Sequence, residues 1–197
     1  MSSIKLKHSG GNSVIIAAPS SNPASDRTLT LPSNADGTML TTTNPKAGNI
    51  IQVLQAVKTD TFSTSSAGFS TITGLEISIT PSSSSNKILI HYDANVSGDD
   101  LSMVRLVRGS TAIAIGDASS SRQRITQGGQ FQGGNNDKVA VYSGSFLDSP
   151  SSTSSLTYKL QVYRHGGTIR VNTTFNDADA SYTGRGISTI TVMEVAG

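Results

Sequence analysis

The chain has 197 residues, a formal net charge of +2 and no cysteine. This length suits one ordinary domain, or a smaller domain with an appended segment. Without cysteine the chain has no disulfide, no thiolate chemistry and no cysteine-based metal site. The basic residues are scattered singly and form no stripe that could follow phosphates, so we expect no nucleic-acid partner.

Serine and threonine make up about a quarter of the chain, and no stretch keeps apolar residues at helical spacing for three turns. Composition and spacing together predict an all-β fold. The first residues lack the apolar run of a signal peptide, and no segment approaches the roughly 20 apolar residues of a membrane span. We therefore expect a protein made in the cytoplasm and not inserted into a membrane.

Up to residue 47 the sequence shows only very short strand candidates, at residues 4–7, 14–18, 28–31 and 38–41. Clusters of glycine, proline, asparagine and aspartate separate them, and these residues favour turns. Such strands cannot close a core alone, because an isolated hairpin is marginal in water. We expect residues 1–47 to need a partner and a polar stretch at 41–49 to link them to a second unit.

The second unit, residues 48–197, contains longer strand candidates at near-regular spacing. They are predicted at residues 50–57, 69–73, 75–80, 87–96, 103–107, 112–115, 139–147, 156–164, 168–172 and 187–195. Many short strands without intervening helices are typical of a β-sandwich or barrel.

Two of these strands also assign faces, because successive side chains of a strand point to opposite sides. In residues 156–164 one alternate set is predicted to face the core, namely Leu156, Tyr158, Leu160 and Val162. In residues 187–195 both sets contain apolar residues: Ile190, Val192 and Glu194 on one side, and Thr189, Thr191, Met193 and Val195 on the other. Two apolar faces predict a central strand or a face that lies against another subunit.

Neither a catalytic nor a cofactor site is predicted. The histidines His8, His91 and His165 lie far from one another and from carboxylate clusters, which argues against a metal site. Residues 143–146 lack the second glycine of a nucleophile elbow, and the glycine pairs match no nucleotide-binding loop. Residues 176–179 alternate oxygen-bearing side chains, so an irregular calcium site is the alternative there to an ordinary polar loop.

The amino-terminal pattern at residues 4–44, centred on residues 27–32 and 36–38, resembles a segment of virion structural proteins of tailed bacteriophages, notably marine and cyanobacterial ones. Pieces at 105–111, 145–150, 157–162 and 188–194 resemble the globular carboxy-terminal domain of such proteins. The resemblance implies an amino-terminal segment that docks to the particle or intertwines in a stalk. It also implies a jelly-roll-like antiparallel β-sandwich displayed outside.

We therefore expect a non-enzymatic virion protein, a short tail-fibre subunit that forms a homotrimer and contacts other tail or capsid proteins. The candidate virion-anchoring residues are Ile4, Leu6, Leu29 and Leu31. Loops at one end of the sandwich are expected to contact a host surface glycan, through Phe131, Arg122, Arg124 and Tyr182. For Phe131, on a glycine-rich loop at 128–136, the alternative is a flexible solvated connection.

Two other functions remain open. The first is capsid decoration, in which the same trimer binds and stabilises the head shell. The second is a virion-displayed polysaccharide depolymerase, which needs paired carboxylates in a groove. The only glutamates, Glu76 and Glu194, are far apart in the sequence, and this disfavours the enzyme.

Overall fold

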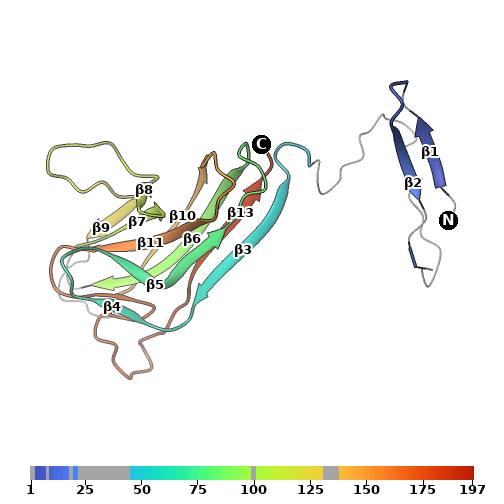
Figure 1. Ribbon diagram of the computed structural model, residues 1–197. Helices are drawn as coiled ribbons and strands as arrows, with labels where there is room; N and C mark the ends of the chain where they lie inside the picture. Colours follow the sequence, from blue (N-terminus) through green and yellow to red (C-terminus); the bar gives the residue numbers. More distant parts are fainter. Residues whose placement is uncertain (1–2, 8, 18–19, 22–44, 99–100, 131–137) are drawn as a thin grey trace, which may run out of the picture. The chain divides into compact units, whose positions relative to one another are not determined.

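The computed structural model describes residues 3–7, 9–17, 20–21, 45–98, 101–130 and 138–197 (Figure 1). The chain divides into two units, Met1–Met39 and Leu40–Gly197. In the described ranges every regular element is a strand, so the all-β prediction is confirmed. Accordingly, those ranges hold no helix of the length and apolarity that a membrane crossing requires.

The first unit contains one antiparallel hairpin, β1 (Ser3–Lys7) and β2 (Ser13–Ala17), whose connection includes Gly11 at a φ of 99°. Leu6, Ile15 and Ile16 are 57%, 56% and 51% exposed. These exposed apolar side chains agree with the expectation that such short strands need a partner. The predicted strands at 28–31 and 38–41, and with them Leu29 and Leu31, lie outside the described residues.

The second unit consists of two antiparallel sheets. The first sheet contains β3 (Ile50–Lys58), β13 (Ser188–Val195), β6 (Lys87–Gly98) and β10 (Ala140–Asp148), with the short strands β12 (Ile169–Val171) and β4 (Phe62–Thr64). The second sheet contains β5 (Gly68–Ile79), β11 (Leu156–Arg164), β7 (Leu101–Arg108), β8 (Thr111–Ile113) and β9 (Gln127–Gln130).

The strand pairing of the second unit is nested. The first long strand, β3, pairs with the last, β13; β5 pairs with β11, and β6 pairs with β10. Innermost, β7 pairs with both β8 and β9, at different heights along its length. This folded-over ribbon, split between two packed sheets, is the arrangement of a jelly roll, as predicted.

The core lies between the two sheets and follows the predicted alternation. Tyr158, Leu160 and Val162 of β11 are fully buried, and Leu156 packs at the edge of the same cluster. Strand β13 is central, between β3 and β6, so the prediction of a central strand is confirmed.

Two local predictions were wrong. Residues 69–73 and 75–80 form the single strand β5, in which Gly74 adopts a φ of 87° next to a register shift against β11. The predicted loop from residue 128 begins as strand β9, which pairs with β7. A Cβ at Gly128 would approach the Ile125 Cδ1 atom to 2.5 Å, so a larger residue there would displace the end of that side chain.

A buried polar cluster ties the two sheets together at one end. Asp148, at the end of β10, accepts bonds from Arg108 Nη1 at 2.8 and 2.6 Å and from the Tyr158 hydroxyl at 2.6 Å. Burial and the bond to Asp148 raise the pKa of Tyr158, so the phenol keeps its proton and donates.

A second cluster surrounds Glu194, which is fully buried although it carries a carboxylate. Its Oε1 accepts bonds from the Ser82 backbone N–H and hydroxyl and from Asn86 Nδ2, at 2.6, 2.7 and 2.5 Å. Its Oε2 accepts a bond from Gln52 Nε2 at 2.6 Å. Burial alone would raise the pKa of Glu194, but these bonds outweigh it and hold the pKa below its ordinary value.

Candidate functional site

The outer face of the first sheet carries an apolar row that crosses four strands. Val53 of β3 lies opposite Met193 of β13, Met193 lies opposite Leu89 of β6, and Leu89 lies opposite Leu147 of β10. Residues opposite one another in antiparallel strands point to the same face. Val53 is 54% and Leu147 46% exposed, so the row faces solvent in the single chain.

Other exposed apolar side chains extend this row towards both edges of the sheet. On β3 these are Ile50 and Val57, and on β10 it is Val141. We call these residues the apolar face: Ile50, Val53, Val57, Leu89, Val141, Leu147 and Met193. A polar row on the same side, Gln55, Thr191, His91 and Ser145, lies between the apolar row and Val57 and Val141.

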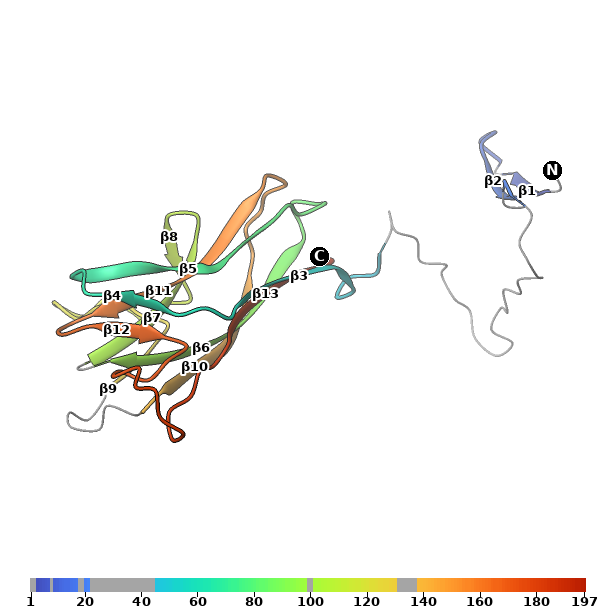
Figure 2. The same ribbon diagram turned by 90° about the horizontal axis from the view of Figure 1, so that it is seen from below.

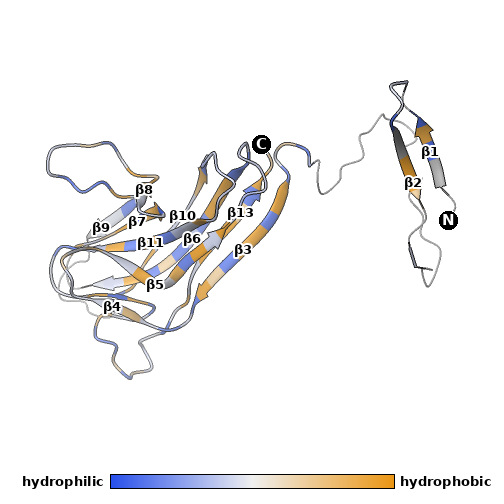
Figure 3. Cartoon of the chain, in the orientation of Figure 1, coloured by the Kyte–Doolittle hydropathy of each residue, from blue (hydrophilic) through white to orange (hydrophobic). Residues whose placement is uncertain are grey.

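Strand β3 is an edge strand, because it pairs only with β13 in the sheet order. Natural edge strands are usually protected by charges, prolines, bulges or a covering segment. The one charged residue of β3, Lys58, is buried and bonds to Asp60 at 2.9 Å. The rest of the strand is uncharged, and its apolar residues are interrupted only by Gln52 and Gln55. Figure 3 shows β3 as mostly orange with blue segments. A long, uncharged and apolar edge favours contact with another chain.

The outer face of the second sheet is different. The Arg105 guanidinium stacks 3.5 Å above the ring of Phe69, which also contacts Tyr163 at a centroid distance of 4.9 Å. Arg105 Nε donates to Gln161 Oε1 at 2.8 Å, and Gln161 Nε2 donates to Thr71 Oγ1 at 3.1 Å. Side chains of this face therefore bond to one another.

The predicted receptor contacts lie on separate loops. Arg122 and Arg124 belong to the connection between β8 and β9, where they bond to Ser119 and to the Gly116 carbonyl. Tyr182, which is 75% exposed, lies on the connection between β12 and β13. Figures 1 and 2 show these two connections projecting from different parts of the sandwich. Phe131 lies outside the described residues, and the contact roles stay predictions.

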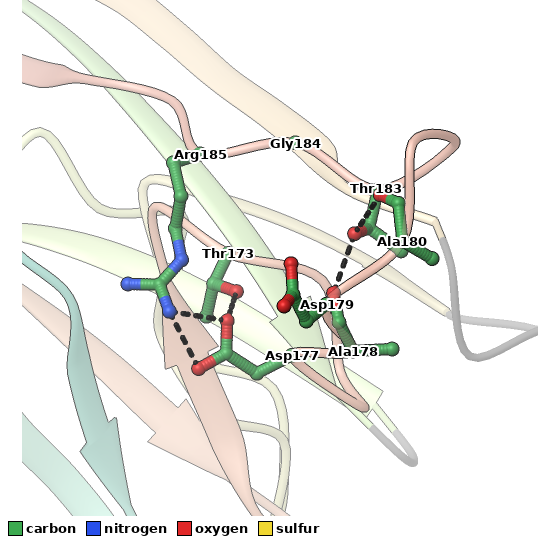
Figure 4. A pocket seen from close by; sticks show the side chains of 8 residues that line it. All are labelled: Thr173, Asp177, Ala178, Asp179, Ala180, Thr183, Gly184 and Arg185. Atoms are coloured by element: carbon green, nitrogen blue, oxygen red, sulfur yellow. Dashed lines mark hydrogen bonds and ion pairs between the residues drawn. The ribbon is translucent and has the colours of Figure 1, made fainter.

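In the part of the chain that the structure describes, no group of three or more histidine, aspartate and glutamate side chains is arranged to hold a metal ion. Asp177 forms an ion pair with Arg185 Nη2 at 2.8 Å and accepts a bond from Thr173 (Figure 4). Its oxygens are thus engaged by protein donors. Glu194 is buried in the first sheet, and Glu76 lies on the second sheet opposite Lys159.

Sequence reasoning missed the apolar face and also a pocket beside Tyr182. The only sequence signal for the face was that residues 50–57 and 187–195 are apolar on both alternate sets. The pocket unites Asn95, Thr174 and Arg185, which no local motif connects.

Comparison with known proteins gave little. No protein-family model matches the sequence, and no curated protein matches it. Among solved structures, the chain is similar to a chain in the structure of infectious bursal disease virus Gx strain, with 13% identity and a TM-score of 0.36. The match covers 93% of this chain and 53% of the other, so the chain spans about half the length of that viral chain.

Proposed function

We propose that this protein is a non-enzymatic structural subunit of a tailed-bacteriophage virion and works as a homotrimer. The apolar face carries the proposal, because a monomer would leave it in water. Two further observations support it. The pattern at residues 27–38 resembles phage virion proteins, and the jelly roll is a fold that viral capsid and lectin domains use, which is support by analogy only.

A ring of three copies needs two different contact surfaces on each chain, and the exposed apolar residues at the two ends of the face can supply them. Val53 and Val57 lie at the β3 edge, whereas Val141 and Leu147 lie at the β10 edge. An isologous dimer uses one patch twice, but a ring joins two different patches of neighbouring copies. Three copies would place the β3 side of each against the β10 side of the next.

The outer side of the first sheet gives an upper limit for the area of the proposed contacts. Strand β3 has nine residues. Four strands about 4.8 Å apart, at about 3.3 Å per residue, span on the order of 600 Å². A ring divides this area between two contacts, so each contact also needs area from neighbouring segments to reach the roughly 800 Å² per partner of a specific complex.

In this proposal the first unit attaches the trimer to the particle and the second unit is displayed. Deleting residues 1–47 is expected to leave a folded β-sandwich that no longer joins particles, because the candidate anchoring residues are gone. Incorporation of the variant into phage particles, followed by immunoblotting, tests this. Incorporation at the level of the full chain would contradict the anchoring role.

Position on the particle separates a tail fibre from the alternative role in head decoration. Labelling intact particles for electron microscopy distinguishes the two sites. Copy number gives a second measure, since a decoration protein is far more abundant than a fibre. An assay for release of oligosaccharides from host envelopes is expected to show no activity.

A further inference from the structure

Strands β3 and β10 form the two edges of the first sheet. Among the described strands β10 pairs only with β6, as β3 pairs only with β13 (Figure 1). Both strands have nine residues, and each has one charged residue, which is buried: Lys58 on β3 and Asp148 on β10. Neither strand contains a proline. Both edges therefore lack the exposed charges and prolines that usually prevent an edge from pairing with another chain.

The backbone of Asn95 shows in which direction the free groups of β10 point. Strands β10 and β12 pair with β6 on opposite sides. The Asn95 N–H donates to the Ser188 hydroxyl at 3.0 Å, and its carbonyl accepts a bond from the Asn172 N–H at 2.9 Å. Both groups therefore point away from β10. Since hydrogen-bonded and non-hydrogen-bonded pairs alternate in an antiparallel ladder, Ser145 and Leu147 direct their N–H and C=O groups to the free edge.

The same alternation continues across the sheet to β3. The register is unbroken along the apolar row and the polar row. The backbone groups of Leu89 point to β13, so those of Met193 point to β6 and those of Val53 point away from β13. Gln55, two residues further along β3, has the same direction as Val53. Both free edges thus present their backbone groups at the same two heights of the sheet.

One end of the β10 edge is already occupied. The Gln127 side chain of β9 donates to the Ser143 carbonyl at 2.9 Å. This bond agrees with the direction derived for the free groups of β10, and it leaves the edge from Ser145 onwards for another strand. Asp93 lies opposite Ser143, so its carboxylate falls beside the occupied end and not beside the open part.

We infer that the free edges of neighbouring copies pair, so that the first sheets of three chains join into one closed ring of strands. The inference rests on the proposed homotrimer and adds how its copies join. Three successive antiparallel pairings make β3 antiparallel to β10 within one chain. A rotation about an axis parallel to the strands keeps their directions, so β3 of one copy and β10 of the next pair in the antiparallel manner.

The side chains favour one register for this pairing. With Leu147 of one copy beside Val53 of the next, the apolar row continues around the ring. Ser145 then lies beside Gln55, whose Nε2 donates to Thr191 Oγ1 at 2.8 Å within its own chain. Gln55 Oε1 can accept a bond from the Ser145 hydroxyl of the neighbouring copy. A shift of two residues would instead place the apolar Leu147 beside the polar Gln55.

The width of the first sheet suits a ring of three. Its four long strands, about 4.8 Å apart, form a side of about 19 Å, and the centre of a triangle with such sides lies about 5.5 Å from each side. Packed sheets lie about 10 Å apart, so each sheet lies about 5 Å from the middle of the side-chain layer. Three outer faces turned to the axis would therefore fill the interior. A square ring of four would place its centre about 9.5 Å from each sheet and leave a channel.

Because the chain contains no cysteine, a pair of introduced cysteines tests the pairing directly. The full-length double variant Val53→Cys with Leu147→Cys is treated with oxidised glutathione and run on a denaturing gel without reductant. Opposite Cα atoms of a hydrogen-bonded antiparallel pair lie about 5.5 Å apart, which suits a disulfide. Within one chain three strand spacings separate the two positions by about 14 Å, so the disulfide can form only between copies.

We expect the double variant to run as three covalently linked chains and each single-cysteine variant to run as one chain. The matched control is Val53→Cys with Ser143→Cys, which places both thiols on the same two strands. In the inferred register they lie about 13 Å apart along the edge, so the control should stay unlinked. Light scattering of the reduced proteins measures the oligomeric mass separately.

The two measurements distinguish the edge pairing from the homotrimer. A trimeric mass without linkage of the double variant would overturn the pairing and leave the proposed homotrimer standing. Covalent dimers of Val53→Cys alone would also overturn it, because two β3 edges would then meet about a two-fold axis. Equal linkage of the Ser143→Cys control would contradict the register. A monomeric mass would contradict the homotrimer itself, and the pairing with it.

Discussion

The two outer faces of the β-sandwich differ in how many large apolar side chains they expose to water. In the described part of the second unit, every exposed large apolar side chain lies on the first sheet or in the segments that lead into β10 and β13. The second sheet instead presents side chains that bond to one another, such as Arg105 with Gln161 and Ser78 with Thr157.

This contrast shows which face has its interactions completed within one chain. On the second sheet the charged Arg105 already has a ring and an amide as neighbours, and in the described residues that sheet exposes no large apolar side chain. On the first sheet the apolar face gains free energy only when another surface excludes water from it. Assembly and folding should therefore respond to mutations on different faces.

The largest effect is expected from placing charges on the apolar face. The double variant Val53→Lys with Leu147→Lys should fold, because both positions are about half exposed in the single chain. Burying two unpaired ammonium groups between subunits should weaken association at least about a hundredfold. Sedimentation velocity over a concentration series measures this.

The matched control for the lysine variant is Thr73→Lys combined with Glu76→Gln, two exposed positions on β5 of the second sheet. Together they raise the net charge by the same two units on the other side of the molecule and should leave association unchanged. Equal dissociation of both variants would mean that net charge, and not the apolar face, governs assembly.

A smaller effect is expected on the free energy of unfolding when Glu194 is substituted. The Glu194 side chain bonds to Gln52 of the edge strand β3. Glu194→Gln replaces one acceptor oxygen by a donor, so it should lower the free energy of unfolding by about 2 kcal/mol at neutral pH. Urea denaturation at fixed protein concentration measures the change. The exposed Glu76 on the second sheet is the control, and Glu76→Gln should change stability by less than about 0.5 kcal/mol.

The stabilisation that the Glu194 carboxylate provides should also depend on pH. Because the pKa of Glu194 is lowered in the folded state, its stabilisation is present above the unfolded pKa of about 4.3 and is lost as pH falls through the folded pKa. Glu194→Gln should therefore lose less stability on acidification than wild type does. An equal loss in both proteins would contradict the role assigned to the carboxylate.

The smallest effect on stability is expected from a substitution on the outer face of the second sheet. Arg105→Met keeps the length of the side chain but removes its stacking on Phe69 and its bond to Gln161, at a cost of about 1 kcal/mol. Thermal unfolding measures the cost, and the oligomeric mass should stay the same. A change in mass would show that this face also takes part in assembly.

The sequence predicted where the strands lie better than which of their faces stay exposed to water. Strand β11 has the predicted bounds because residues 156–164 alternate strictly between core and solvent. Strands β4 and β9 were not predicted, since each has four residues or fewer and β9 contains two glycines. Such strands are defined by their pairing with β12 and β7 and not by their own propensity.

The candidate sites could not be derived from the sequence for a related reason. Alternation shows that residues 187–195 have two apolar faces, but it does not tell which of them the same chain covers. The pocket joins Asn95 to Thr174 because the Asn172 backbone N–H donates to the Asn95 carbonyl. That contact follows from the fold, and only Tyr182 of the lining was predicted to contact a ligand.

The mass of the purified full chain in solution tests the central claim most directly. Light scattering coupled to size-exclusion chromatography should give three times the 20.4 kDa of one chain, because the apolar face is expected to be covered by neighbouring copies. A mass of 20.4 kDa at micromolar concentration would contradict the account, since a stable monomer would leave the apolar face and the β3 edge in water.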